Sequence, residues 1–308
     1  MRSLRSALAL LLTATATTAG LLFAGVTPAQ AGADDVVVML HGYHSGANGQ
    51  GGNDAYQCTD FWAVQRQALR TAGHRGPTYT VGWYSDNVAG SCDVNLQSTV
   101  YSKDFAGRAG DGPANNGQPL ALLTHNSPLE HVGYRFAWAM AKIADDNPGR
   151  TIHVIANSLG GPLVRHAIVQ VSRGTADYPS LNRIRVAGVY TYASPLRGTT
   201  LARWGDTVQA QQSRPAAGFI QYLNAADNRR RVGSATWYGF AGAVVPGVDG
   251  IGDGLVSRES ACLDVARACC SVDRRIVVST WSGSSPSAAT ISCTCSSVRS
   301  PDCRSSFS

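Results

Sequence analysis

Charged residues are scarce in this 308-residue chain: they make up 15% of it, whereas hydrophobic residues make up 44%. This balance excludes an intrinsically disordered class, because such chains combine few apolar residues with a high net charge. No linker-like stretch divides the chain. Its length therefore fits one large domain with a substantial core.

Long apolar runs are missing beyond the N-terminus, so we expect no stable insertion into a membrane. The N-terminus has two arginines, an apolar and small-residue stretch from Ala7 to Val26, and the small-residue site Ala29-Gln30-Ala31. This order is typical of a secretory signal peptide. We expect residues 1–31 to be removed by cleavage after Ala31 and the mature protein to be extracellular. The alternative, a membrane anchor, is disfavoured by the hydroxyl side chains within the stretch.

Several ligand-binding patterns are also missing. No glycine-rich loop runs into the Gly-Lys-[Ser/Thr] of a phosphate-binding loop, and no calcium-loop pattern of alternating acidic residues is present. The formal net charge of +6 comes mainly from arginines in the leader and after Cys262, and the body between them is nearly balanced. The charge therefore predicts no nucleic-acid partner.

The stretch from Thr151 to Ile168 reads as a strand, a tight turn and a helix. Ser158 stands at the apex of the turn, where a strained backbone would lift its side chain above the sheet edge. Small residues two positions before and after it, Ala156 and Gly160, let strand and helix approach closely. The N-terminal N–H groups of the following helix point at the same spot, which suits a developing oxyanion.

A second strand is predicted at Val36 to Leu40, a continuous apolar run typical of a buried parallel strand. It ends in His41-Gly42-Tyr43. Glycine just after a strand lets the backbone turn its N–H groups toward a ligand. We interpret His41 itself as structural rather than catalytic.

These segments resemble the α/β-hydrolase superfamily, and in particular secreted bacterial lipases and esterases, over about residues 34 to 261. The turn at Ser158 resembles the nucleophile elbow G-x-S-x-G, with alanine at the first glycine. His41-Gly42 resembles the turn beside the nucleophile, and Asp253-Gly254-Leu255-Val256 is similar to the D-G-x-V segment of lipases. The resemblance implies an α/β-hydrolase fold with a mostly parallel central sheet and helices on both faces.

The resemblance also implies a reaction and roles. Carboxylic esters would be hydrolysed through an acyl-enzyme on Ser158, with Asp253 orienting the base and Asp249 as the alternative acid. The backbone N–H groups of Tyr43 and Leu159 would form the oxyanion hole. This chemistry needs no metal and no organic cofactor, and the substrate would be an ester or lipid. An acyltransferase or peptidase on the same fold stays open, as does the oligomeric state.

The base is missing from this scheme. The superfamily order is Ser, then acid, then His, but no histidine follows Asp253. His166 lies eight positions along the helix from Ser158, which is too far, and His125 or His131 would reach it only by an unusual rearrangement. The catalytic histidine is therefore unassigned, and we expect impaired activity. The alternative is a non-catalytic binding module on the same fold.

Cysteines divide the mature chain. Cys58 and Cys92 are the only two before residue 262, and in a secreted protein we expect them to form a disulfide. The remaining six lie in a Cys/Ser-rich tail without clear strand and helix alternation. We therefore separate an α/β-hydrolase domain, residues 32–261, from an irregular tail, residues 262–308.

Two hypotheses account for the tail. We favour a shift of reading frame near Cys262, because almost all basic residues of the chain are arginines, as in a G+C-rich gene, whose other frames yield Arg, Ser, Cys and Pro. The alternative is a genuine extension with its six cysteines paired among themselves.

Three further local predictions concern the middle of the chain. A helix from about Phe61 would bury Phe61, Val64, Ala68 and Ala72. Residues 100–127 form an insertion that we interpret as a lid or cap. A capping box at Ser127 to Glu130 would open the next helix, with His131 in a cap or surface role.

Overall fold

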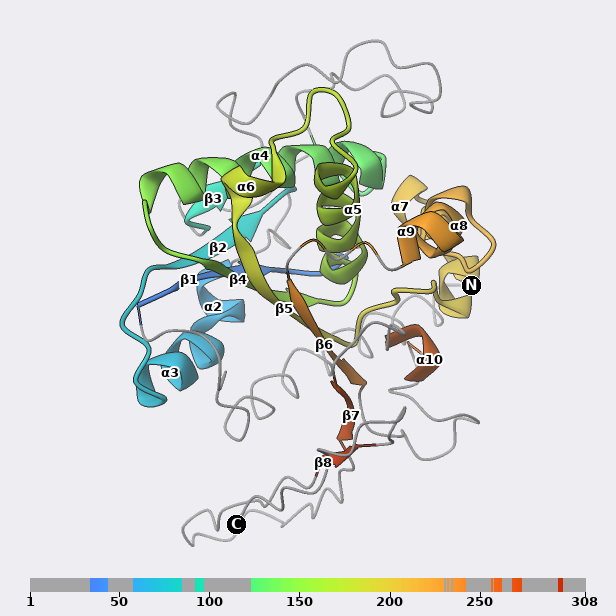
Figure 1. Ribbon diagram of the computed structural model, residues 1–308. Coiled ribbons are helices and arrows are strands. Elements are labelled where there is room, and N and C mark those ends of the chain that lie inside the picture. Colours follow the sequence, from blue (N-terminus) through green and yellow to red (C-terminus); the bar gives the residue numbers. More distant parts are fainter. Residues whose placement is uncertain are drawn as a thin grey trace, which may run out of the picture.

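The computed structural model describes residues 34–43, 58–84, 92–96, 123–229, 231, 233, 235–241, 256, 258–261, 268–272 and 293–295 (Figure 1). The leader, most of the expected insertion and both acidic candidates, Asp249 and Asp253, lie outside the described residues. No helix among the described residues is long and apolar enough to cross a membrane.

In the described part of the chain, the strands form one eight-stranded sheet in the order β3-β2-β1-β4-β5-β6-β7-β8. All neighbouring pairs are parallel except β7 and β8, which are antiparallel. The strands are β1 (Val36–Leu40), β2 (Thr78–Gly82), β3 (Val94–Asn95), β4 (Ile152–Asn157), β5 (Val186–Tyr192), β6 (Thr236–Ala241), β7 (Ala268–Val272) and β8 (Cys293–Cys295). The predicted mostly parallel sheet is confirmed.

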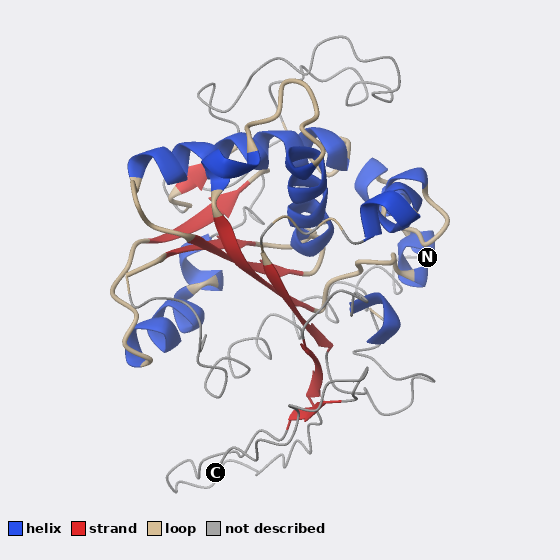
Figure 2. Cartoon of the chain, in the orientation of Figure 1, coloured by secondary structure: helices blue, strands red, loops and turns tan. Residues whose placement is uncertain are grey.

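Helices cover both faces of the sheet (Figure 2). The long helices α4 (Leu129–Asp146) and α5 (Gly160–Ser172) lie on one face with α6 (Leu181–Ile184), and α2 (Cys58–Phe61) and α3 (Ala63–Thr71) lie on the other. The other helical segments are η3 (Thr200–Trp204), α7 (Val208–Gln212), α8 (Gly218–Asn224), α9 (Ala226–Arg229) and α10 (Arg258–Ala261). This is the predicted arrangement of a mostly parallel central sheet with helices on both faces.

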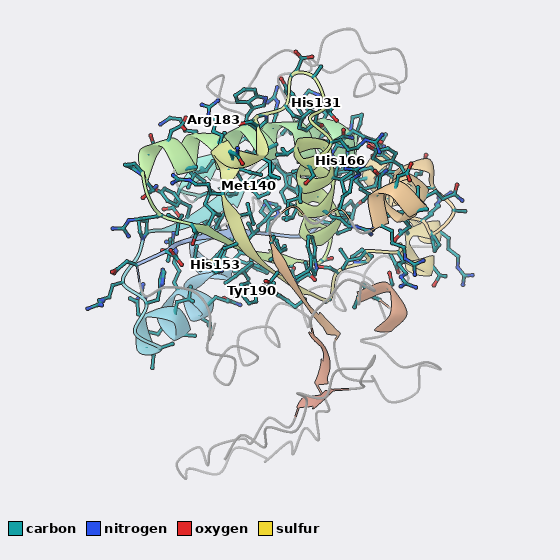
Figure 3. The ribbon with its side chains drawn as sticks, viewed as in Figure 1. His131, Met140, His153, His166, Arg183 and Tyr190 are labelled. Atoms are coloured by element: carbon teal, nitrogen blue, oxygen red, sulfur yellow. A yellow bond between two sulfur atoms is a disulfide. The ribbon has the colours of Figure 1, made fainter. Side chains whose placement is uncertain are left out.

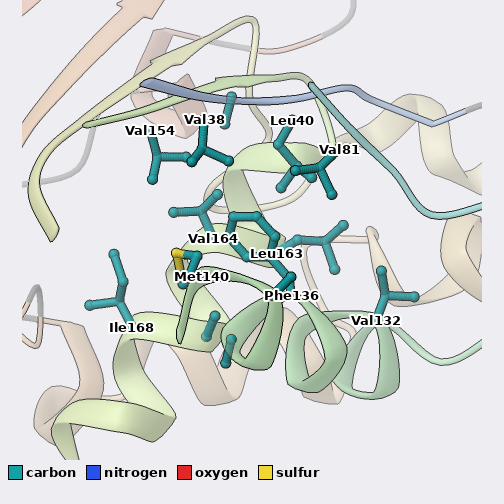
Figure 4. Packing of buried hydrophobic residues seen from close by; sticks show 14 of the residues in the cluster. Val38, Leu40, Val81, Val132, Phe136, Met140, Val154, Leu163, Val164 and Ile168 are labelled. Carbon is teal, nitrogen blue, oxygen red and sulfur yellow. The ribbon is translucent and has the colours of Figure 1, made fainter. Parts of the chain in front are cut away.

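The larger core lies between the sheet and helices α4 and α5. Its side chains are fully or almost fully buried, and fully burying one such side chain contributes about 1.5–3 kcal/mol. Figure 4 shows this packing for Val38, Leu40, Val81, Val132, Phe136, Met140, Val154, Leu163, Val164 and Ile168. The helix expected after Ser127 is present as α4, and its apolar side chains pack in this core. The same core fixes the strand and the helix that flank Ser158.

The face predicted for the helix on the opposite side is wrong. Val64 was expected inside, but it is 51% exposed, whereas Gln65 and Leu69 are buried. The reason is Trp62, which lies between α2 and α3 and buries its indole completely. Positions three and seven after this large side chain then lie on the inward face.

Cys58 and Cys92 form a disulfide, as the sequence predicts. Cys58 begins α2, and Cys92 lies just before β3 at the edge of the sheet. Both belong to the smaller apolar cluster around Trp62. The bond therefore ties the helical layer on this face to the edge of the sheet.

Strands β7 and β8 come from the tail, where the sequence shows no clear alternation of strand and helix. β7 extends the parallel sheet beside β6, and β8 pairs with β7 in a register that places Cys270 opposite Cys295. The rest of the tail lies outside the described residues.

The order of the strands marks one point on the sheet. From β1 the chain proceeds to β2 and β3 on one side, and from β4 onward it proceeds to the other side. In open α/β sheets, ligands bind at the carboxyl ends of the two strands where the order reverses. Here those strands are β1 and β4, which lead directly into Gly42 and Ser158.

Candidate active site

Ser158 follows β4 in a left-handed backbone conformation, with φ of 49°. A non-glycine residue pays roughly 1–2 kcal/mol for this conformation. Two hydrogen bonds hold it: the Ser158 N–H donates to the Tyr192 carbonyl at 3.0 Å, and the Gly161 N–H donates to the Ser158 carbonyl at 3.0 Å. The predicted strained turn between strand and helix is therefore present.

Glycines around this turn sit where no side chain fits. A Cβ at Gly42 would lie 2.7 Å from the Ser158 Cβ, and one at Gly160 would lie 2.6 Å from the His41 carbonyl oxygen. Both distances are far below normal van der Waals contact. The turn after β1 and the start of α5 are thus packed directly against the serine.

Two backbone N–H groups near Ser158 have no acceptor among the described residues. Those of Tyr43 and Leu159 donate no hydrogen bond to any residue that the structure describes. These are the two donors that the resemblance assigns to an oxyanion hole. N–H groups that have no acceptor in the described part of the chain, after a strand and before a helix, are suited to an anionic oxygen.

The His41 side chain orients one of these donors. Its Nδ1–H donates to the Gly42 carbonyl at 2.8 Å, and the buried ring stacks on Trp83 with the ring centroids 3.9 Å apart. A carbonyl only accepts, so Nδ1 must carry the proton. In a trans peptide the C=O and N–H point in opposite directions, so the Tyr43 N–H points away from the imidazole. This geometry agrees with a structural role for His41.

The Ser158 hydroxyl has no hydrogen-bond partner among the described residues. In particular, no described histidine accepts its proton. Figure 3 shows His131, His153 and His166 on separate elements. His153 lies on β4, with Nε2 3.3 Å from a carboxylate oxygen of Asp35 near the start of the sheet.

Burial keeps two of these histidines neutral near pH 7. Burial lowers the pKa of His166 to about 3, and its Nε2 accepts a hydrogen bond of 3.2 Å from the Gln170 amide. Burial, with a smaller contribution from Arg135, lowers the pKa of His131 to about 4. The expected cap or surface role of His131 is wrong, because its side chain lies inside, in the first turn of α4.

The predicted capping box is also wrong. The Ser127 hydroxyl accepts a hydrogen bond from the Thr124 N–H at 2.8 Å, and the Glu130 carboxylate accepts one from Gln212 at 2.7 Å. The helix begins at Leu129, and its N-cap residue, Pro128, makes no side-chain capping bond. Instead, the Gln212 amide oxygen accepts the Leu129 N–H at 2.7 Å. Gln212 on α7, 82 positions along the chain, thus binds the Glu130 carboxylate that the local pattern assigned to the cap.

No sequence pattern points to the buried Arg165 on α5. Its guanidinium donates to the Leu196 carbonyl at 3.1 Å, the Asn224 side chain at 3.0 Å and the Leu223 carbonyl at 2.6 Å. Burial lowers its pKa to about 9, and the positive charges of Arg197 and Arg229 add to this effect. Arg165 thus fastens the loop after β5 and the end of α8 to helix α5, which follows the turn at Ser158.

Among the described residues, no group of three or more His, Cys, Asp or Glu side chains is placed to hold a metal ion. The chemistry that the described residues offer at this edge of the sheet is that of a serine hydroxyl and two backbone N–H groups without a described acceptor. Such a site suits attack on a carbonyl whose oxygen becomes negative.

No protein-family model matches the chain, and no curated protein matches it. Among solved structures, the mature lipase BlEst2 of Bacillus licheniformis is similar with a TM-score of 0.46 and 14% identity, over 79% of this chain and 85% of that one. Phospholipase PlaB of Legionella pneumophila is similar with a TM-score of 0.43 and 14% identity, over 74% of this chain and 45% of that one. This chain therefore spans less than half of the phospholipase.

Proposed function

We propose that this protein is a serine hydrolase of the lipase or esterase type that cleaves carboxylic esters through an acyl-enzyme. Ser158 Oγ attacks the ester carbonyl carbon, its proton passes to a base, and the alcohol leaves. Water then attacks the acyl-serine and releases the acid. The N–H groups of Tyr43 and Leu159 stabilise the negative oxygen in both steps.

The strained backbone of Ser158 is the single observation that carries this proposal. Strain of this kind persists only where the surroundings enforce it, and it gathers at functional sites. Here a glycine at position 42 and the hydrogen bond to the Tyr192 carbonyl enforce it. The conformation serves no packing purpose for a side chain that is partly exposed and has no hydrogen-bond partner among the described residues.

The proposed mechanism needs a general base, and no residue is assigned to that role. Asp253 is proposed as the acid that would orient it, and lies outside the described residues. A second candidate function rests on one observation: no described histidine bonds to the Ser158 hydroxyl. A protein with the fold and the two free donors but no base would bind esters or carboxylates without turning them over.

The test offers purified protein a short-chain chromogenic ester, with and without imidazole, beside a Ser158→Ala variant. Imidazole is a diffusible base that replaces a missing histidine. A fluorophosphonate probe, followed by peptide mass analysis, reports whether Ser158 forms a covalent adduct. The variant controls for hydrolysis at other sites.

Three outcomes distinguish the proposed esterase from a protein that only binds its ligand. Turnover that needs Ser158 but not imidazole establishes the esterase and a base within this chain. Turnover that needs both establishes a nucleophile that lacks its base. Equal rates from both proteins, with no labelled Ser158, exclude hydrolysis and leave the binding function.

Secretion is a further part of the proposal. The predicted leader ends at Ala31, and the disulfide between Cys58 and Cys92 fits an oxidising compartment. We expect the protein in the culture medium to begin at Gly32. N-terminal sequencing of that protein tests it, and a chain that keeps its first residues in the cell would contradict it.

A further inference from the structure

The short helix α7 is held to the ends of β1 and β2 by two tyrosine hydroxyls. The Tyr43 hydroxyl lies 3.1 Å from the Thr207 Oγ1, and the Tyr84 hydroxyl donates to the Gln209 side chain at 2.7 Å. The Gln209 amide in turn donates to the Thr124 carbonyl at 3.0 Å. Because α7 belongs to the segment between β5 and β6, these bonds fix that segment over the carboxyl edge of the sheet.

Only the bond between Tyr43 and Thr207 involves the turn after β1, residues 41–43, which we call the oxyanion turn. Tyr43 follows Gly42 and carries one of the two free N–H groups beside Ser158. Its backbone peptide is restrained on the carbonyl side by the His41 imidazole, as described above. Its side chain reaches across 164 positions of sequence to Thr207. The residue that carries the donor is therefore restrained at both ends.

Thr207 is itself held rigidly. Its side chain is buried, and its Oγ1 also accepts the Ala210 N–H at 3.1 Å, which caps the first turn of α7. A hydroxyl fixed by the helix is a better anchor than a freely rotating one, because less rotamer freedom is lost when the second bond forms. The Tyr43 phenol is mostly shielded as well, and burial raises its pKa, so it stays neutral and able to donate or accept.

We propose that Thr207 is a positioning residue that, through the Tyr43 hydroxyl, holds the Tyr43 N–H in the orientation that an oxyanion requires. This inference rests on the proposed function for its catalytic consequence, but not for the restraint itself. Without the bond, the Tyr43 hydroxyl loses its anchor on α7, and the side chain keeps only its apolar packing against the larger core. Displacement of a donor by a fraction of an ångström weakens its bond to a charge that develops only in the transition state.

The restraint is tested without turnover. Protein labelled with ¹⁵N only at tyrosine gives an amide spectrum in which the Tyr43 signal is assigned by its loss in Tyr43→Phe. We expect Thr207→Ala to move this signal and Thr207→Ser, which keeps the hydroxyl, to leave it in place. Tyr84→Phe is the matched control, since it also removes a tyrosine hydroxyl bound to α7 but lies outside the oxyanion turn. An unmoved Tyr43 signal in Thr207→Ala overturns the proposal.

The catalytic consequence is tested by kinetics with the same variants. Tyr43→Phe and Thr207→Ala are each expected to lower kcat by roughly 10-fold to 100-fold with little change in KM, and the double variant to lose no more than either. Tyr84→Phe should keep the wild-type kcat. Losses that multiply in the double variant would show that Thr207 acts through the α7 cap alone, which overturns the proposal. If the wild-type protein lacks Ser158-dependent turnover, the proposed function fails, and the amide signal alone decides the restraint.

Discussion

Ser158 and Ala193 occupy equivalent positions at the ends of neighbouring strands, and both have a left-handed backbone, with φ of 49° and 48°. Asn157 and Tyr192, the last residues of β4 and β5, are partners in the sheet register. The Tyr192 carbonyl accepts both the Ser158 N–H at 3.0 Å and the Ser194 hydroxyl at 3.2 Å. The two strained turns are thus joined through one carbonyl, and each restrains the other.

Backbone strain at Ser158 predicts which of two substitutions there gives the more stable protein. We expect Ser158→Gly to be more stable than Ser158→Ala by about 1 kcal/mol, because glycine adopts a positive φ without a steric penalty. Urea unfolding of the two variants measures the difference. Ala68→Gly in α3 is the control, since glycine in an ordinary helix costs about 1 kcal/mol relative to alanine. If alanine is the more stable residue at both positions, Ser158 is not strained.

Gly42 allows no side chain against Ser158. Gly42→Ala would place a methyl group 2.7 Å from the Ser158 Cβ, so the turn or the serine must move. We expect a loss of about 1–3 kcal/mol in the free energy of unfolding and a loss of fluorophosphonate labelling at Ser158. Gly218→Ala serves as the control, because a Cβ there meets nothing within 4 Å. Wild-type labelling in the Gly42 variant would contradict this close approach.

The elements that position the site could be predicted because their signals are local. The run Val36 to Leu40 is continuously apolar, which is typical of a strand buried on both faces, and β1 has these bounds. The turn at Ser158 is marked by small residues on both sides. Cys58 and Cys92 could be paired because no other cysteine precedes residue 262.

Features that depend on distant partners could not be predicted in this way. The inward face of α3 is set by Trp62 and its packing on the far side of the sheet, not by the spacing of Val64. The bond between Tyr43 and Thr207 joins residues 164 positions apart, and neither residue belongs to a motif. His131 is polar, but the helix around it places it inside. In each case a contact with a distant part of the chain determines where the side chain lies, and the local sequence pattern does not contain that information.

Loss of the disulfide should destabilise the folded domain. Cys58 and Cys92 are 34 positions apart, and closing a loop of that length removes chain entropy equivalent to about 4 kcal/mol from the unfolded state. We expect Cys58→Ser with Cys92→Ser to lower the free energy of unfolding by up to that amount. Urea unfolding measures it without reductant, so that cysteines of the tail keep their state. An unchanged midpoint would mean that the bond closes no stabilising loop.

Buried His166 should make the domain sensitive to acid. Its folded pKa of about 3 lies below the ordinary value of about 6.5, so the unfolded chain binds its proton first as the pH falls. The full stability contribution is present above pH 6.5 and is lost progressively toward pH 3. At pH 5, about 1.5 units below the ordinary value, the loss from this one group is about 2 kcal/mol.

Replacement of His166 isolates this effect from the other titrating groups. The ring packs against Phe219, with the centroids 5.5 Å apart, so His166→Phe keeps an aromatic ring in the same cluster. We expect its stability to fall between pH 7 and pH 5 by about 2 kcal/mol less than that of the wild-type protein, whatever its stability at pH 7. Phe219→Leu perturbs the same cluster but keeps the imidazole, so its pH dependence should match the wild type. If all three proteins lose stability in parallel, His166 takes up its proton in the folded state and the burial argument is wrong.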